Sequence, residues 1–144
     1  MKISILIPVY NDWESVSELI KNINIEIKDL NHDFSVIIIN DASLEKKELN
    51  FQSLKNINLI ELIHMKENRG HARCNAFGIR YVFRNKEFDY LLLMDGDGED
   101  RPIEVKSLID KINEENTVSV VAKRVQRSEG PIFKSLYQIH KLIT

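Results

Sequence analysis

Short apolar runs alternate with stretches of helical period along the chain, and this alternation restricts the fold more than any other feature. The apolar runs cover residues 3–9, 34–39, 59–65, 90–94 and 118–122. Runs of this kind, with no polar residue at every second position, are typical of strands buried on both faces of a parallel sheet. The order strand, helix, strand therefore predicts an α/β fold, with a mostly parallel sheet and helices on both faces.

The segments between the runs predict the helices. Residues 13–30 place apolar side chains at spacings of three and four behind Asn11 and Asp12, which favour a helix start. Residues 69–84 and the segment that begins at Pro102 also have helical character. Residues 44–55 are polar with few apolar positions, which predicts a weak helix. No repeat or linker interrupts residues 1–125, so we expect one Rossmann-like domain there and a basic amphipathic tail over 126–144.

Charge and cysteine content narrow the class of protein. A net charge of -2 over 144 residues gives no general attraction to nucleic acid. The single cysteine, Cys74, excludes an internal disulfide and fits a reducing compartment, and we interpret it as a buried filler rather than a nucleophile. The amino-terminal apolar run is too short for a signal peptide, so we expect a cytoplasmic protein, with the cytoplasmic face of a membrane as the alternative.

Polar clusters follow the predicted strands. They are Tyr10-Asn11-Asp12, Asn40-Asp41-Ala42-Ser43, Asn68-Arg69-Gly70-His71 and Asp95-Gly96-Asp97. Ligands of open α/β sheets bind at the carboxyl ends of the strands, so we expect these clusters to meet at one edge of the sheet. We interpret His71 as a surface or loop residue rather than a base.

The most acidic cluster, 95–100, allows three kinds of site. An EF-hand loop that starts at Asp95 needs glycine at its sixth position and glutamate at its twelfth, but Asp100 and Lys106 stand there. A haloacid-dehalogenase-like phosphatase also uses Asp-x-Asp after a strand, and it stays open as an alternative although its further motifs are missing. The third kind of site holds a divalent metal beneath a diphosphate.

The metal interpretation depends on Asp95 and Asp97. Residues two apart on an extended chain face the same way, so both carboxylates can point at one ion. Mg²⁺ and Mn²⁺ favour such oxygen ligands and neutralise charge on a leaving diphosphate. We expect Gly96 and Gly98 to let the backbone come close to the ligand, and Asp100 to cap the helix near Pro102.

Four of these motifs in order resemble the family 2 glycosyltransferases of the GT-A fold. The motifs are Ile7-Pro8-Val9-Tyr10-Asn11-Asp12, Ile39-Asn40-Asp41-Ala42-Ser43, Asn68-Arg69-Gly70-His71-Ala72-Arg73-Cys74-Asn75 and Asp95-Gly96-Asp97. They correspond to the family's P-x-Y/F-N-E start, its D-D-x-S turn, its asparagine-glycine helix entrance and its D-x-D metal motif. Within this family, the sequence most resembles the members that are similar to dolichol-phosphate-mannose synthase.

The resemblance implies a role for each matching residue. It places Pro8 and Tyr10 at the nucleotide base, Asp12 near the base or ribose, and Asp41 as the acceptor of a base N–H. Asn40 replaces the aspartate that usually precedes Asp41. Further, the resemblance places Arg73 beside the diphosphate, Asp95 on the ribose and metal side, and Asp97 on the metal, with Glu99 as an assisting ligand.

The resemblance also implies the two substrates, and it shows that a recognisable catalytic base is missing from this sequence. The donor is expected to be a UDP- or GDP-linked sugar with Mn²⁺ or Mg²⁺, and the acceptor a lipid-linked molecule or a polysaccharide. No catalytic base is recognisable, so we interpret the chain as a nucleotide-sugar-binding half that transfers sugar poorly alone. The tail is expected to approach a membrane surface or to pack on a second copy. A non-catalytic nucleotide-binding module remains a further alternative.

Overall fold

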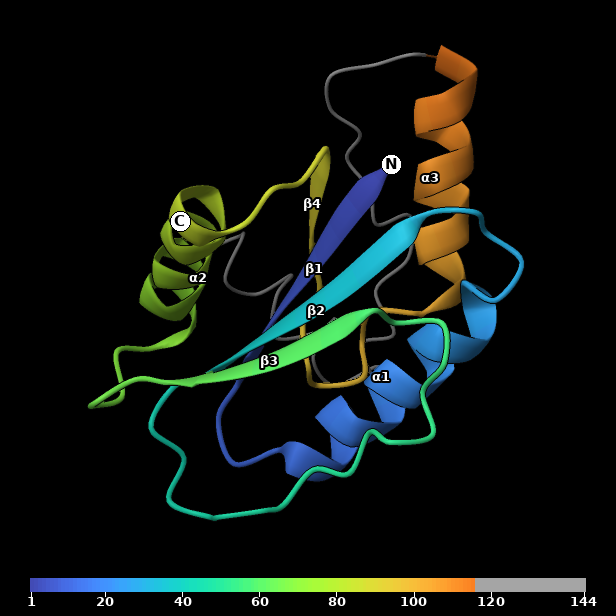
Figure 1. The fold of residues 1–144 in the computed structure, drawn as a ribbon. Helices are drawn as coiled ribbons and strands as arrows, with labels where there is room; N and C mark the ends of the chain where they lie inside the picture. The colour runs from blue at the N-terminus through green and yellow to red at the C-terminus, as the bar shows by residue number, and fades with distance from the viewer. Residues whose placement is uncertain (116–144) are drawn as a thin grey trace, which may run out of the picture.

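The computed structural model describes residues 1–115, which form four strands and three helices in alternating order (Figure 1). The elements are β1 (Lys2–Val9), α1 (Trp13–Glu26), β2 (Asp33–Asn40), β3 (Leu59–His64), α2 (His71–Asn85), β4 (Tyr90–Leu93) and α3 (Ile103–Glu115). The predicted strand over 118–122 and the tail over 126–144 lie outside the described residues. Within residues 1–115, none of the helices has the length and apolar character needed to cross a bilayer.

The four strands form one parallel sheet in the order β3-β2-β1-β4. β1 is central and pairs along its whole length with β2, from Lys2 opposite Asp33 to Val9 opposite Asn40. Every residue of β1 after Lys2 is buried, which explains why its sequence is apolar without alternation. The predicted α/β fold is confirmed.

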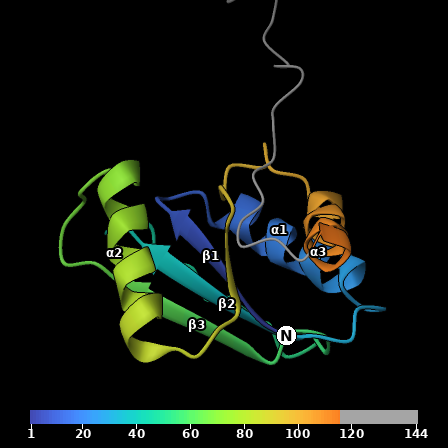
Figure 2. The ribbon, with the colours of Figure 1, turned by 90° about the horizontal axis from the view of Figure 1, so that it is seen from above.

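Helices cover both faces of this sheet, with α1 and α3 on one face and α2 on the other (Figures 1 and 2). Alternate residues of the central strands therefore enter two different cores. Ile5 and Ile7 belong to the larger core with α1 and α3, whereas Leu6 belongs to the smaller core with α2. Full burial of each such side chain stabilises the fold by roughly 1.5–3 kcal/mol.

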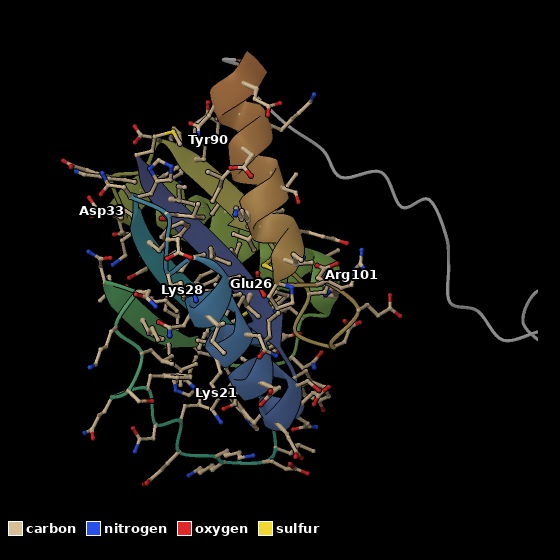
Figure 3. All side chains as sticks on the ribbon, turned by 90° about the vertical axis from the view of Figure 1, so that its right-hand side faces the viewer. Lys21, Glu26, Lys28, Asp33, Tyr90 and Arg101 are labelled. Carbon is tan, nitrogen blue, oxygen red and sulfur yellow. The ribbon has the colours of Figure 1, made fainter. Side chains whose placement is uncertain are left out.

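The start of α1 follows from local sequence. The Asp12 side chain accepts a hydrogen bond from the Ser15 N–H at 3.3 Å, which caps the first turn. The apolar face predicted for this helix is buried, including Trp13, Val16 and Ile20. The charged side of the helix faces away from the sheet, where Lys21 and Glu26 point outward (Figure 3).

The predicted weak helix over 44–55 is wrong, because this segment contains no helix. Its first backbone N–H groups bond elsewhere, since those of Leu44 and Glu45 donate to Asn11 Oδ1 at 2.8 and 3.3 Å. The Glu45 carbonyl accepts from the Trp13 indole at 3.0 Å. The sparse apolar residues of the segment, Leu49, Phe51 and Leu54, pack against the larger core from an irregular chain. Tertiary contacts therefore replace the helical hydrogen bonds.

The smaller core explains Cys74 and Gly78. The Cys74 side chain is fully buried, and its Sγ lies 3.7 Å from the Ile39 carbonyl oxygen. Burial, together with the nearby Asp41 carboxylate, raises the pKa of the thiol to about 11, which keeps it protonated and unreactive. At Gly78 a Cβ would lie 2.6 Å from Leu6 Cδ1, so glycine lets α2 approach β1 closely. The interpretation of Cys74 as a buried filler is confirmed.

A polar cluster joins the end of α2 to the outer strand β3, and it makes stability depend on pH. Glu61 accepts a hydrogen bond from the Tyr81 hydroxyl at 2.5 Å and forms an ion pair with Lys86. Lys86 foremost, and then the Tyr81 hydroxyl, hold the pKa of Glu61 below its ordinary value of 4.5. Because the folded state favours the carboxylate, its stabilisation is complete above pH 4.5 and is lost as pH falls through the lower folded-state pKa.

Replacing Glu61 with glutamine should therefore lower the free energy of unfolding by about 1 kcal/mol at neutral pH. The difference from the unmodified protein should vanish under acid conditions, where the carboxyl is protonated in both states. Urea unfolding across the acid range measures this, with Glu48→Gln, at an exposed loop position, as the control. A pH-independent difference would contradict the assignment.

Candidate functional site

The carboxyl ends of the parallel strands meet at one edge of the sheet, as expected. Backbone hydrogen bonds continue past the strands there, from the Asp41 N–H to the Val9 carbonyl at 2.9 Å and from the Met94 N–H to the Leu6 carbonyl at 3.0 Å. These bonds hold the polar loops after β1, β2 and β4 beside one another. A cavity of about 330 Å³ opens at this edge.

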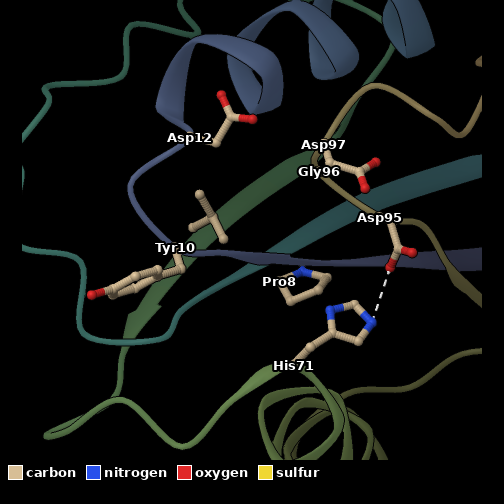
Figure 4. Close-up of a pocket in the computed structure, with 8 residues that line it drawn as sticks. Pro8, Tyr10, Asp12, His71, Asp95, Gly96 and Asp97 are labelled. Atoms are coloured by element: carbon tan, nitrogen blue, oxygen red, sulfur yellow. Dashed lines mark ion pairs between the residues drawn. The ribbon is translucent and has the colours of Figure 1, made fainter. Parts of the chain in front are cut away.

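Eight residues from three parts of the chain line the cavity: the end of β1 with the loop after it, the start of α2, and the loop after β4 (Figure 4). They are Pro8, Val9, Tyr10, Asp12, His71, Asp95, Gly96 and Asp97. Among the sequence-predicted site residues, Pro8, Tyr10, Asp12, Asp95 and Asp97 are therefore brought together. Asp41, Arg73 and Glu99 are not part of the lining. The Tyr10 ring, 46% exposed, extends away from the two acids and is free to stack on a planar group.

The acidic loop 95–100 is closed by its own side chains. The Asp100 carboxylate accepts from the Asp95 N–H at 2.7 Å, and the Asp97 carboxylate accepts from the Glu99 N–H at 3.0 Å. Asp100 thus fixes the loop, a role different from the helix cap that the sequence suggested, since α3 begins only at Ile103. Gly98 has a φ of 84°, a backbone conformation that favours glycine.

Gly96 is required by packing. A Cβ there would lie 2.6 Å from Val16 Cγ2 and 3.0 Å from the Pro8 carbonyl oxygen. We expected this glycine to let the backbone approach a ligand. In the structure its close neighbours are protein atoms, so the packing of Val16 and Pro8 requires the glycine. The contact presses the loop that carries Asp95 and Asp97 onto the end of β1 and the first turns of α1.

His71 belongs to the site, although the sequence interpretation set it aside. Its Nε2 atom lies 3.3 Å from Asp95 Oδ1, and its side chain is 60% exposed (Figure 4). The residue is the first of α2 and enters the cavity from the loop after β3. The available signal was its place at a strand end, which is the criterion that selected Tyr10 and Asp95.

Asp41 is buried beneath the loop that precedes α2. Its side chain is 4% exposed, and its two oxygens accept from the backbone N–H groups of Arg69 and Gly70 at 2.8 and 2.9 Å. The carboxylate lies at the amino-terminal end of α2, where the helix dipole favours negative charge. In this structure Asp41 shapes the entrance to α2, and its predicted contact with a base stays a prediction.

This arrangement gives a test of Asp41. Asp41→Asn leaves one acceptor oxygen for the two backbone N–H groups, so unfolding should become easier by about 1–3 kcal/mol. Hydrogen exchange at the Arg69 and Gly70 amides should accelerate. An exposed aspartate, Asp29→Asn, is the control. Unchanged exchange at both amides would show that the carboxylate does not hold this turn.

Asn40, the departure from the family's usual aspartate, uses both ends of its amide. Its Oδ1 accepts from the Ser43 N–H at 2.8 Å, and its Nδ2 donates to His64 Nδ1 at 2.8 Å. An aspartate can only accept, and it would need a proton on that histidine nitrogen. Ser43 in turn accepts from the Asn11 N–H at 2.8 Å, so this network ties the loops after β1 and β2 together.

The donor set fits a metal that takes few protein ligands. Asp95 and Asp97 line the same cavity, whereas Glu99 does not. Across residues 1–115, no three histidine, cysteine, aspartate or glutamate side chains converge on one point as a closed metal site would require. Two carboxylates with open positions suit Mg²⁺ or Mn²⁺ that completes its shell with water and phosphate oxygens.

Arg73, which the resemblance places beside the diphosphate, and its neighbour Arg69 lie outside the cavity lining. Arg69 forms an ion pair with Glu67, and Arg73 is exposed on α2 without lining the cavity. The predicted contact of Arg73 with a diphosphate stays a prediction.

Comparison with known proteins agrees with this fold. The family model described as glycosyl transferase family 2 matches residues 4–143. Crystal structures of S. aureus TarS 1-349, alone and in complex with UDP, are similar to this fold with TM-scores of 0.58 and 0.59, each at 20% identity. Each match covers 89% of this chain but only 39% of the TarS chain, so the chain spans well under half of that relative.

Proposed function

The chain belongs to glycosyl transferase family 2, and we propose from this premise that it binds a nucleoside diphosphate sugar at the cavity and transfers the sugar to an acceptor. The observation that carries the proposal is the convergence of Asp95 and Asp97 with Pro8 and Tyr10 in one cavity. An aromatic ring for the base and two carboxylates for a metal are the groups that such a donor requires. The S. aureus TarS complex with UDP supports this choice of ligand class.

Each group then has a defined task. Tyr10 stacks on the base, with Pro8 beneath it and Asp12 near the base or ribose. Asp95 and Asp97 hold Mg²⁺ or Mn²⁺, which neutralises the charge that develops on the leaving nucleoside diphosphate. His71, 3.3 Å from Asp95, orients that carboxylate. Glu99 and Arg73 stay as proposed helpers at the metal and diphosphate, although neither lines the cavity.

The proposed organisation of the chain follows the motifs. Residues 1–125 would form the donor-binding domain, and the basic tail over 126–144 would lead toward a membrane, as in members that resemble dolichol-phosphate-mannose synthase. The proposed location is the cytoplasm or the cytoplasmic face of a membrane. We assign neither an acceptor-binding residue nor a catalytic base within residues 1–115.

Calorimetric titration of the full chain with UDP and GDP, with and without Mn²⁺, tests the proposal. We expect one diphosphate to bind, and its affinity to rise at least about tenfold when the metal is added, because Asp95 and Asp97 would hold a cation that offsets the negative charge of the diphosphate. Binding that ignores the metal would contradict the role of the acidic pair. Hydrolysis of simple phosphate esters without nucleotide binding would instead favour the phosphatase alternative.

A further inference from the structure

The outward face of α2 carries an apolar strip and a basic strip side by side. Helical spacing aligns the exposed residues Ala72, Ala76, Ile79 and Phe83 in one strip and Arg73, Arg80 and Arg84 in the other. Phe83 is 77% exposed and Ile79 is 38% exposed. A phenylalanine this exposed on a regular helix leaves apolar surface in water that a binding partner can cover.

The arginines of this face are not neutralised by the part of the chain that the structure describes. Residues 71–85 include no acid, and within residues 1–115 none of the three arginines forms an ion pair. The neighbouring acids are engaged by other cations, Glu67 by Arg69, Glu61 by Lys86 and Glu87 by Lys2. The face is therefore positively charged on a chain whose net charge is -2.

Within residues 1–115, the position of α2 leaves this face open. Among the elements of this part of the chain, α2 is the outermost on its side of the sheet, and the other two helices lie on the opposite side (Figure 2). Its buried residues Cys74, Gly78 and Val82 face the sheet, so the two strips face away from it.

We infer that the outward face of α2 docks on an anionic phospholipid bilayer. A bilayer surface offers phosphates and an apolar interior a few ångströms apart, which matches arginines placed beside Phe83 and Ile79. Arginine stems lie along the apolar boundary while the guanidinium groups reach the phosphates. A nucleic acid duplex also offers phosphates, but its apolar base faces are stacked inside, so it leaves Phe83 uncovered.

Docking by this face has a consequence for the site, which rests on the proposed function. His71 is the first residue of α2 and lines the cavity, so the cavity opens at the end of the docking helix. With α2 lying along the bilayer, its first residue and the edge of the donor site lie within about one helix diameter of the lipid surface, or roughly 10–12 Å. This geometry favours an acceptor that is carried by a lipid.

Vesicle sedimentation with the full chain tests the surface. Vesicles of phosphatidylcholine and phosphatidylglycerol in equal parts should bind the protein, and pure phosphatidylcholine should bind it poorly. The double variant Arg80→Gln/Arg84→Gln should bind about 25-fold more weakly, at roughly fivefold per arginine. Phe83→Ser should weaken binding roughly tenfold. The matched control is Lys21→Gln/Lys28→Gln, which removes the same charge on the opposite side of the sheet (Figure 3) and should bind as the unmodified protein does.

A fluorescent label separates docking by α2 from binding by any other segment. Cys74 is buried, so a thiol reagent reaches a cysteine introduced at the exposed strip residue Ala76 (Ala76→Cys), which leaves Phe83 in place. The control is Ile25→Cys on α1, where the side chain is 57% exposed. A spin-labelled lipid should quench the label at position 76 and not the label at position 25. Vesicle binding without quenching at position 76, equal losses in both double variants, or no vesicle binding would each overturn the proposal. None of these readouts requires nucleotide, so they are independent of the proposed transfer activity.

Discussion

Replacing Asp97 with alanine should abolish metal-dependent binding of the nucleoside diphosphate, with a loss of affinity on the order of 100-fold. The carboxylate lines the cavity together with Asp95, and these two side chains are the proposed oxygen donors to an ion there. Its bond within the protein is a local one to the Glu99 N–H, and the residue is exposed, so the fold should survive. Calorimetry with UDP or GDP at fixed Mn²⁺, together with circular dichroism, measures both effects.

A charge-matched control excludes a general electrostatic effect. Asp110→Ala removes one negative charge from the exposed side of α3, away from the cavity, and should leave the affinity unchanged. Without metal, the affinity for the nucleoside diphosphate should be similar in the unmodified protein and in Asp97→Ala, because Asp97 contributes to nucleotide binding only through the ion. If Asp97→Ala retains the full effect of Mn²⁺, the ion binds elsewhere and the assignment is wrong.

Replacing Gly96 with alanine should weaken nucleotide binding by roughly 10- to 100-fold while costing about 1–3 kcal/mol of stability. The added Cβ would lie 2.6 Å from Val16 Cγ2 and 3.0 Å from the Pro8 carbonyl oxygen, and the backbone oxygen cannot rotate away. The loop must therefore move off β1, and it carries Asp95 and Asp97 with it. Binding assays and urea unfolding of the same preparation separate the two losses.

Two further variants locate the cause in this contact. Val16→Ala in the Gly96→Ala background removes the closer atom and should restore part of the affinity, although Val16→Ala alone destabilises the core. Gly98→Ala meets nothing within 4 Å, and its φ of 84° predicts only strain of about 1–2 kcal/mol. If Val16→Ala gives no rescue, the Val16 contact is not the cause of the loss.

Sequence reasoning identified the site residues that lie just after the carboxyl ends of strands. Tyr10, Asp12, Asp95 and Asp97 each come directly after an apolar run, and parallel strands must deliver such residues to one edge. The same reasoning placed His71 at the surface, where the structure also has it, but the 3.3 Å distance from its ring to Asp95 is not encoded in local spacing. It also predicted a helix over 44–55, where contacts with Asn11 and Trp13 take over the backbone groups.

The sequence alone determined the parallel sheet, its helices and the acidic loop, because hydrophobic period and turn residues act over a few neighbouring positions. Only the tertiary structure decided how side chains distant in the sequence share their hydrogen bonds. It places Asp41 under the turn before α2, Asp100 across its own loop, and Gly96 against Val16 and Pro8. These contacts depend on the approach of separate elements in space, and the free energy of burying an unpaired carboxylate or crowding a Cβ appears only once those elements have packed.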